Sequence, residues 1–189
     1  MPLICMTSAD ENSSQSTRLD QYIRLTAEND AEAFARLYRE TAKAVYAYAL
    51  SLLKNRQDAE DVLHDCYVSI YHAAEGYQSQ GRPMAWIMTI AKNLCYQTLR
   101  QRSRSGEATE EDWERLLAKS TLSADDRLMV RACMEQLRDD ERKVLLLHAV
   151  AGFRHREIAE FLDLPLSTVL SKYTRASKKL RTIMEKESM

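Results

Sequence analysis

The chain has 189 residues, with 27 Lys or Arg against 28 Asp or Glu, so its formal net charge is −1. It holds only 4 Gly and 3 Pro, and no stretch approaches the ~20 apolar residues of a membrane-spanning helix. These features exclude a membrane-spanning protein, and the start lacks a secretory leader. They favour an all-helical protein over one of short strands and tight turns, and they predict a cytoplasmic location.

Residues 7–17 are rich in Ser, Asn, Asp and Glu, and residues 1–18 are predicted to form a flexible tail. A first helical module is predicted over residues 19–102, with helices near 19–28, 30–53, 56–75 and 83–101. In the third of these, apolar residues recur at helical spacing from Ala59 to Ile70. The acidic residues of that helix therefore fall on its other face.

Residues 103–123 are polar and acidic, and they are predicted to be a flexible linker. A second module is predicted over residues 124–185, with helices near 124–137, 139–151, 154–162 and 166–185. The predicted fold class is thus all-α, with two helical modules joined by the linker.

The near-zero net charge hides a strong segregation of charge along the chain. Residues 82–104 and 166–181 contain Lys and Arg but no acid, whereas acids gather in residues 58–65 and 107–114. Basic stretches of this kind suit a nucleic-acid backbone, although a solvated helix face is the alternative for any one of them.

The cysteines offer no metal site, because they lie far apart and form neither a CxxC pair nor a Cys/His cluster at zinc spacing. Free thiols in a reducing compartment are predicted, and no metal or other cofactor is expected. The four are Cys5, Cys66, Cys95 and Cys133.

The strongest local motif lies between Arg154 and Leu180. A short apolar-striped helix is interrupted at Asp163, where a left-handed turn residue is expected, and a second helix follows with Val169 and Ala176 inward. This is helix-turn-helix spacing, and an ordinary helical hairpin is the alternative. Polar and basic residues are predicted to face outward or cap the second helix, ready for a DNA major groove: Ser167, Thr168, Ser171, Lys172, Thr174, Arg175 and Lys178.

These motifs occur together in a known family. Residues 137–147, 157–162, 167–169 and 175–176 resemble region 4 of the extracytoplasmic-function RNA polymerase sigma factors. Residues 33–38, 58–62, 85–87 and 90–94 resemble region 2 of the same family, in the same order. The resemblance covers residues 19 to 183 and implies a transcription-initiation subunit rather than an enzyme.

The resemblance also assigns roles to the first module. The acidic helix is expected to dock on core RNA polymerase through Asp58, Glu60, Asp61, His64 and Asp65. The basic helix and the loop before it are expected to recognise and melt the −10 element of promoter DNA. The expected −10 contacts are Tyr77, Gln78, Gln80, Lys92, Asn93, Tyr96 and Arg100, with Lys92, Asn93, Tyr96 and Arg100 on the outward face. Trp86 is expected to pack in the core or as a semi-buried wedge.

The second module is implied to read the −35 element, and there the sequence departs from the family. Leu170 stands where a basic residue is common, and Ser177 where an arginine is common. The departures leave the fold unaffected and predict an unusual −35 preference.

Two partners beyond DNA follow from the resemblance: core RNA polymerase, and an anti-sigma factor that is soluble or membrane-anchored. A stand-alone helix-turn-helix regulator is the alternative, which predicts tight duplex binding without polymerase and an apolar pocket in the first module. A helical-bundle enzyme would need convergent polar residues on an inward face, and the pattern shows none. No small-molecule substrate is expected.

Overall fold

The computed structural model describes residues 9–105 and 137–187, and every regular element in these two ranges is a helix. The all-α fold class is confirmed for this part of the chain. None of these helices is long and apolar enough to cross a membrane. The expected helix near 124–137 and most of the expected linker, together with Cys5 and Cys133, lie outside the described residues.

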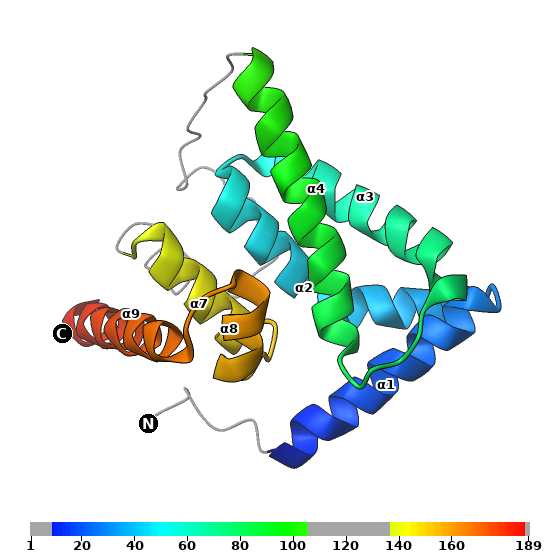
Figure 1. Cartoon of the computed structure of the whole chain (residues 1–189), viewed down its shortest axis with the longest axis horizontal. Coiled ribbons are helices and arrows are strands. Elements are labelled where there is room, and N and C mark those ends of the chain that lie inside the picture. Colours follow the sequence, from blue (N-terminus) through cyan, green and yellow to red (C-terminus); the bar gives the residue numbers. More distant parts are fainter. Residues whose placement is uncertain (1–8, 106–136, 188–189) are drawn as a thin grey trace.

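Five helical elements build the first module: α1 (Ala9–Ala27), α2 (Ala31–Leu53), α3 (Arg56–Ala73), the short 3-10 turn η1 (Ala74–Gly76) and α4 (Pro83–Ser105). Figure 1 shows α4 crossing α2 and α3, against which it packs. Short polar side chains fix two of the helix starts. Asp30 accepts the amides of Glu32 and Ala33 at 2.9 and 3.0 Å, and Asn55 accepts the amide of Asp58 at 3.0 Å.

The expected flexible tail is wrong for residues 9–18, which belong to helix α1. Leu19 and Ile23 are buried in the core and anchor this helix, whose polar N-terminal half precedes them in the chain. The Ser16 hydroxyl donates a hydrogen bond to the carbonyl of Gly81, at 2.9 Å, in the loop before α4. A tertiary contact of this kind gives the Ser-rich segment a partner that its composition does not reveal.

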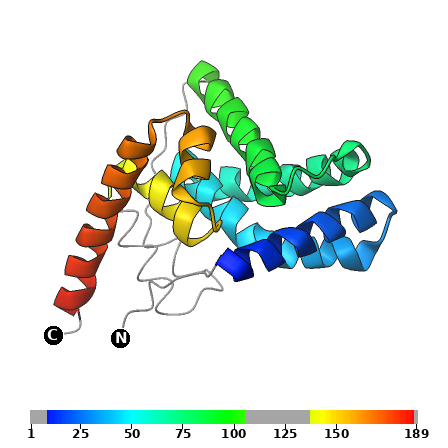
Figure 2. The ribbon, with the colours of Figure 1, turned by 60° about the horizontal axis from the view of Figure 1, so that its bottom comes forward.

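The second module holds α7 (Asp139–Ala149), α8 (His155–Leu162) and α9 (Leu166–Glu187). Its helices pack through Val144, Leu147 and Ile158, all fully buried. Figures 1 and 2 show α9 resting on α7 and α8 at the outer edge of the molecule, with its C-terminal end directed away from the first module.

The two modules share one hydrophobic core in the described part of the chain. Helix α7 packs along α2, and α8 touches α4. A single buried cluster therefore runs from Tyr48 and Ile87 in the first module to Leu147 and Ile158 in the second. The sequence predicted two modules joined by a linker and gave no indication of this direct contact.

Candidate functional site

Helices α8 and α9 form the expected helix-turn-helix. Asp163 ends α8 in the left-handed conformation, with φ 54° and ψ 51°, as its position in the sequence predicted. The amide of Leu164 then donates to the carbonyl of Ala159 at 2.9 Å, which closes the turn. Helix α9 begins after Pro165, and its buried face presents Val169, Ala176 and Leu180 to the module core.

A cluster of three rings packs the start of α8 against α7 and α9. His155 stacks on His148 of α7 at 4.5 Å between ring centroids, and Tyr173 of α9 meets both rings edge-on. His148 Nδ1 lies 2.8 Å from the carbonyl oxygen of Phe153. Burial, together with the neighbouring His148, lowers the pKa of His155. The neutral ring is therefore favoured, which suits a packing role.

Most of the residues expected to contact −35 DNA lie on the exposed face of α9: Ser167, Ser171, Thr174, Arg175 and Lys178. Thr168 is half-buried, and its carbonyl accepts the Ser171 hydroxyl at 2.9 Å. Between Leu166 and Arg181, α9 carries no acid. Its exposed face is therefore positive and rich in hydroxyl groups.

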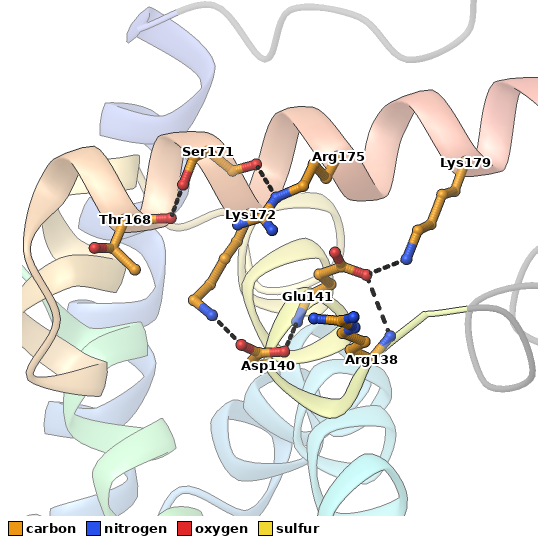
Figure 3. Close-up of polar contacts among 8 residues, drawn as sticks. All are labelled: Arg138, Asp140, Glu141, Thr168, Ser171, Lys172, Arg175 and Lys179. Atoms are coloured by element: carbon orange, nitrogen blue, oxygen red, sulfur yellow. Dashed lines mark hydrogen bonds and ion pairs between the residues drawn. The ribbon is translucent and has the colours of Figure 1, made fainter.

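The outward orientation expected for Lys172 is wrong. Its side chain is only 15 % exposed, and its ammonium forms an ion pair with Asp140 at the start of α7. Lys179 repeats the arrangement two turns later with Glu141, at 2.7 Å. Figure 3 shows both lysines reaching from α9 toward α7 while Arg175 turns elsewhere. The two lysines hold the pKa values of Asp140 and Glu141 below their ordinary range, so both carboxylates are stabilised in the charged form.

A cavity of about 470 Å³ opens where the loop after η1 meets α4. Three expected −10 residues from the loop, Tyr77, Gln78 and Gln80, line it together with Trp86. The Tyr77 ring lies 4.7 Å from the Trp86 ring, tilted by 54°, and its hydroxyl donates to Asp20 of α1. The rings of Tyr77 and Trp86 and the amides of Gln78 and Gln80 thus line a cavity at the surface. Trp86 is half-buried, as expected.

The basic face of α4 is divided. Asn93, Tyr96 and Arg100 are exposed as expected, but Lys92 is half-buried beneath α8. Its ammonium donates to the carbonyl of Phe161 at 2.6 Å and lies 4.7 Å from the centre of the Phe161 ring. The outward orientation expected for Lys92 from helical phase therefore fails, because the second module covers that part of α4.

Further polar and aromatic contacts hold the second module against the first. Arg82 pairs with Glu160 of α8 at 2.6 Å, and the Phe161 ring meets Tyr48 of α2 edge-on at 5.9 Å. Lys54, at the end of α2, lies 3.6 Å from Asp139 of α7. Together with the contacts of Lys92, they define a closed arrangement of the two modules.

The acidic residues of α3 also separate into two groups. Asp58 forms an ion pair with Arg102 near the end of α4, and both side chains are about four-fifths buried. Glu60 accepts Arg56 Nε at 2.6 Å within its own helix. Asp61, His64 and Asp65 are exposed on one face. The structure thus places the last three residues on the surface and engages Asp58 between helices.

An aromatic groove next to the exposed acids was missed by the sequence reasoning. It encloses about 800 Å³ between α2 and α3, and its rim carries three large exposed side chains, Tyr38, Val68 and Tyr71. Glu60 and His64 line the same groove. Val68 and Tyr71 fall outside the apolar stripe of α3, and large apolar residues outside a buried stripe are the signal that points to such a surface.

No cluster of three or more metal-ligating side chains occurs among the described residues. Cys66 and Cys95 are buried as free thiols, and burial raises the pKa of each to about 12. Neither thiol is a nucleophile at neutral pH in such an environment.

Comparisons with known proteins agree with this arrangement. Family models for sigma-70 region 2 and sigma-70 region 4 match residues 37–105 and 127–180. The chain therefore has the two DNA- and polymerase-binding regions that define a sigma-70-type initiation factor. A relative that is 30% identical along most of its length is an extracytoplasmic-function sigma factor, and this chain belongs to that group of RNA polymerase sigma factors.

The relatives support that grouping along most of the chain. The factor SigK of Mycobacterium sp. (strain KMS) is 30% identical over 165 residues, which cover 83% of this chain and 86% of the relative. SigK of Mycobacterium tuberculosis (strain ATCC 25177 / H37Ra) is 28% identical, with 90% and 95% covered.

Two solved structures share the fold. The sigma factor RpoE of Bartonella quintana, solved with the anti-sigma factor NepR, gives a TM-score of 0.63 at 23% identity, covering 82% of this chain and 98% of that one. CnrH, solved with the cytosolic domain of CnrY, gives 0.59 at 22% identity, covering 89% and 97%.

Proposed function

We propose that this chain binds core RNA polymerase through α3, captures the −10 element at the cavity beside α4, and reads the −35 element with α9. The observation that carries the proposal is the separation of three surfaces of different chemistry on two modules. One is acidic and aromatic, one is an aromatic- and amide-lined cavity, and one is basic and rich in hydroxyls. The role requires no covalent chemistry from the chain and takes place in the cytoplasm, where promoters are transcribed.

The polymerase surface consists of the exposed acids of α3 and the aromatic groove beside them. Asp61 and Asp65 supply negative charge for arginines of a partner helix, and Tyr38 and Tyr71 supply apolar area. Interfaces combine a desolvated aromatic centre with a charged rim, and these residues have that composition. Asp58 is excluded from this surface because its pairing with Arg102 ties α3 to α4.

The −10 surface is the 470 Å³ cavity and the exposed part of α4. An unpaired base needs an aromatic face to stack on and hydrogen-bonding groups to meet its edges. Tyr77 and Trp86 offer the faces, while Gln78 and Gln80 offer amides. Arg100 and Asn93, exposed further along α4, lie where a sugar-phosphate backbone would follow.

The closed arrangement has to open before Lys92 meets DNA. Its ammonium is bound to the carbonyl of Phe161, so a phosphate contact requires α8 to leave α4. Polymerase binding provides the free energy for that opening in this proposal. We also propose that an anti-sigma protein binds the closed arrangement, in keeping with the anti-sigma factor NepR that is bound to RpoE.

The decisive experiment is in-vitro transcription with core polymerase, comparing the wild-type chain with two charge variants. Asp61→Lys together with Asp65→Lys should abolish holoenzyme assembly while circular dichroism shows the helical fold intact. Glu28→Lys with Glu75→Lys, on exposed positions outside the α3 surface, is the matched control and should assemble normally. Normal assembly of the α3 variant would contradict the polymerase surface.

A second experiment tests the duplex-reading surface. Replacing Arg175 and Lys178 by Ala should lower transcription from promoters that depend on their −35 element, because two phosphate-neutralising groups are lost. Unchanged output would contradict this assignment. Tight, specific duplex binding by the chain without polymerase would favour a stand-alone regulator instead.

The anti-sigma proposal is tested by purification of the chain from its native host under non-inducing conditions. A stoichiometric partner that leaves under inducing conditions is expected. Recovery of the chain only in free form or bound to polymerase would contradict it.

A further inference from the structure

The recognition helix carries an exposed apolar pair in its first two turns. Leu166 is 36 % exposed and Leu170 is 44 % exposed, and the four-residue spacing places them one turn apart on the same side of α9. Leucine at two exposed positions of a helix that otherwise shows hydroxyls and cations requires an explanation. The pair is the only aliphatic member of that exposed face among the described residues of α9.

The same two turns lack a long polar side chain free to read a base. Lys172 is the one Lys, Arg, Asn or Gln between Leu166 and Thr174, and its ammonium is tied to Asp140. Purine edges are read mainly by bidentate Arg, Lys, Asn or Gln, so this part of the helix is poorly suited to guanine or adenine. The available chemistry near the start of α9 is apolar.

Two hydroxyl groups close to Leu170 are also engaged within the helix. Ser171 donates to the carbonyl of Thr168, and Thr174 donates to the carbonyl of Leu170, both at 2.9 Å. Their hydrogens are therefore used by the backbone, which leaves Leu170 as the largest feature of this surface. Exposed cations follow in the next turns at Arg175 and Lys178, where they suit flanking phosphates.

We propose that Leu170, supported by Leu166, packs against the C5-methyl group of a thymine in the major groove and so fixes a thymine in the −35 element. Thymine is the one standard base that presents a methyl group there. The N-terminal part of a recognition helix is the part that reaches base edges. This inference rests on the proposed function of α9 and specifies the base that it reads.

The test removes the methyl group alone by replacing thymine with uracil. Run-off transcription of genomic DNA from the host with reconstituted holoenzyme first supplies a promoter. Duplexes of that promoter are then made with uracil at one −35 thymine at a time, and holoenzyme affinity is measured by competition. For the wild-type chain, uracil at one or two positions should lower affinity about fourfold, the effect of one buried methyl group.

Leu170→Ala is the matched protein variant, and its exposed position leaves the fold unaffected. It should bind the thymine promoter about fourfold more weakly than wild type and show no further loss with uracil at the same position. Leu170→Met, which keeps apolar contact, should retain the sensitivity to uracil. Equal uracil sensitivity in wild type and Leu170→Ala, or none in either, would overturn the proposal.

Lys178→Ala separates this proposal from the function on which it rests. It should weaken binding to thymine and uracil duplexes by the same factor, because a phosphate contact is indifferent to the methyl group. If Lys178→Ala weakens binding but no position responds to uracil, the −35 function stands and the thymine contact fails. If the holoenzyme starts at no promoter, both fail. Loss of core-polymerase binding in Leu170→Ala would assign the pair to a protein contact and overturn the proposal.

Discussion

Phe161 is one of the side chains through which the helix-turn-helix contacts the first module. Its ring meets Tyr48 of α2 edge-on at 5.9 Å, and the Lys92 ammonium of α4 lies 4.7 Å from its centre. The substitution Phe161→Ala removes both contacts, and with them the edge-on contact of the ring with Phe153 inside the second module, at 5.6 Å. It leaves the hydrogen bond from Lys92 to the backbone carbonyl and the pair between Arg82 and Glu160 in place.

The size of the effect follows from these contacts. An edge-on aromatic pair and a cation over a ring each contribute about 1 kcal/mol, and the half-buried ring loses about 1 kcal/mol of apolar burial. The closed arrangement should therefore weaken by about 3 kcal/mol relative to an open one. That is a shift of about 150-fold in the ratio of closed to open molecules.

Small-angle X-ray scattering and urea unfolding measure the consequence. Phe161→Ala should have a larger radius of gyration than wild type, and its single unfolding transition should separate into two. Phe34→Ala is the matched control, because Phe34 is another half-buried ring with two edge-on partners, both inside the first module. It should destabilise that module without expanding the chain. Identical scattering of Phe161→Ala and wild type would refute the role given to Phe161.

Three further predictions concern single contacts. Arg102→Ala should lower the free energy of unfolding by about 3 kcal/mol in urea titrations, because it leaves the largely buried Asp58 carboxylate without its cation. Polymerase affinity should be unchanged, since Asp58 serves the fold. Lys179 lowers the pKa of Glu141 in the folded protein. The ion pair therefore stabilises the folded state above pH ~4.3, and this contribution is lost as the pH falls through the folded pKa. Unfolding measured from pH 6 to 3 should therefore show a shallower decline in Lys179→Ala; an unchanged slope would contradict the pairing. Tyr77→Phe should slow promoter opening about fivefold with duplex binding intact, because one hydroxyl bond is lost, and 2-aminopurine fluorescence at the −10 element reports it; wild-type opening would count against the cavity.

Local rules explain why the helices and the turn were predictable. Asp30 and Asn55 are short polar residues at helix starts, where their side chains accept free amides. Asp163 tolerates the left-handed conformation that the helix-turn-helix needs, and the structure places it there. Each of these features depends on residues within one or two turns, so the sequence contains what is needed.

The neighbours of exposed-looking residues were not predictable in the same way. Helical phase places Lys172 at the edge of the buried face of α9. Only the position of α7 decides that the carboxylate of Asp140, 32 residues earlier in the chain, lies within reach of its ammonium. Lys92 faces outward by phase and is nevertheless covered by α8, sixty-nine residues later in the chain. Phase reports on which side a residue lies, whereas burial depends on what packs against that side.

The contacts of Lys92 link the binding of the two proposed partners, because core polymerase needs the open arrangement and the anti-sigma protein needs the closed one. For a ligand that needs the open arrangement, the apparent Kd is the intrinsic Kd divided by the fraction of molecules that are open. For a ligand specific for the closed arrangement, it is the intrinsic Kd divided by the fraction that are closed. Phe161→Ala should therefore strengthen the apparent affinity for core polymerase and weaken that for a protein that holds the modules together. If both affinities fell together, Phe161 would lie in a surface that each partner touches, and the closed arrangement would not control their exchange.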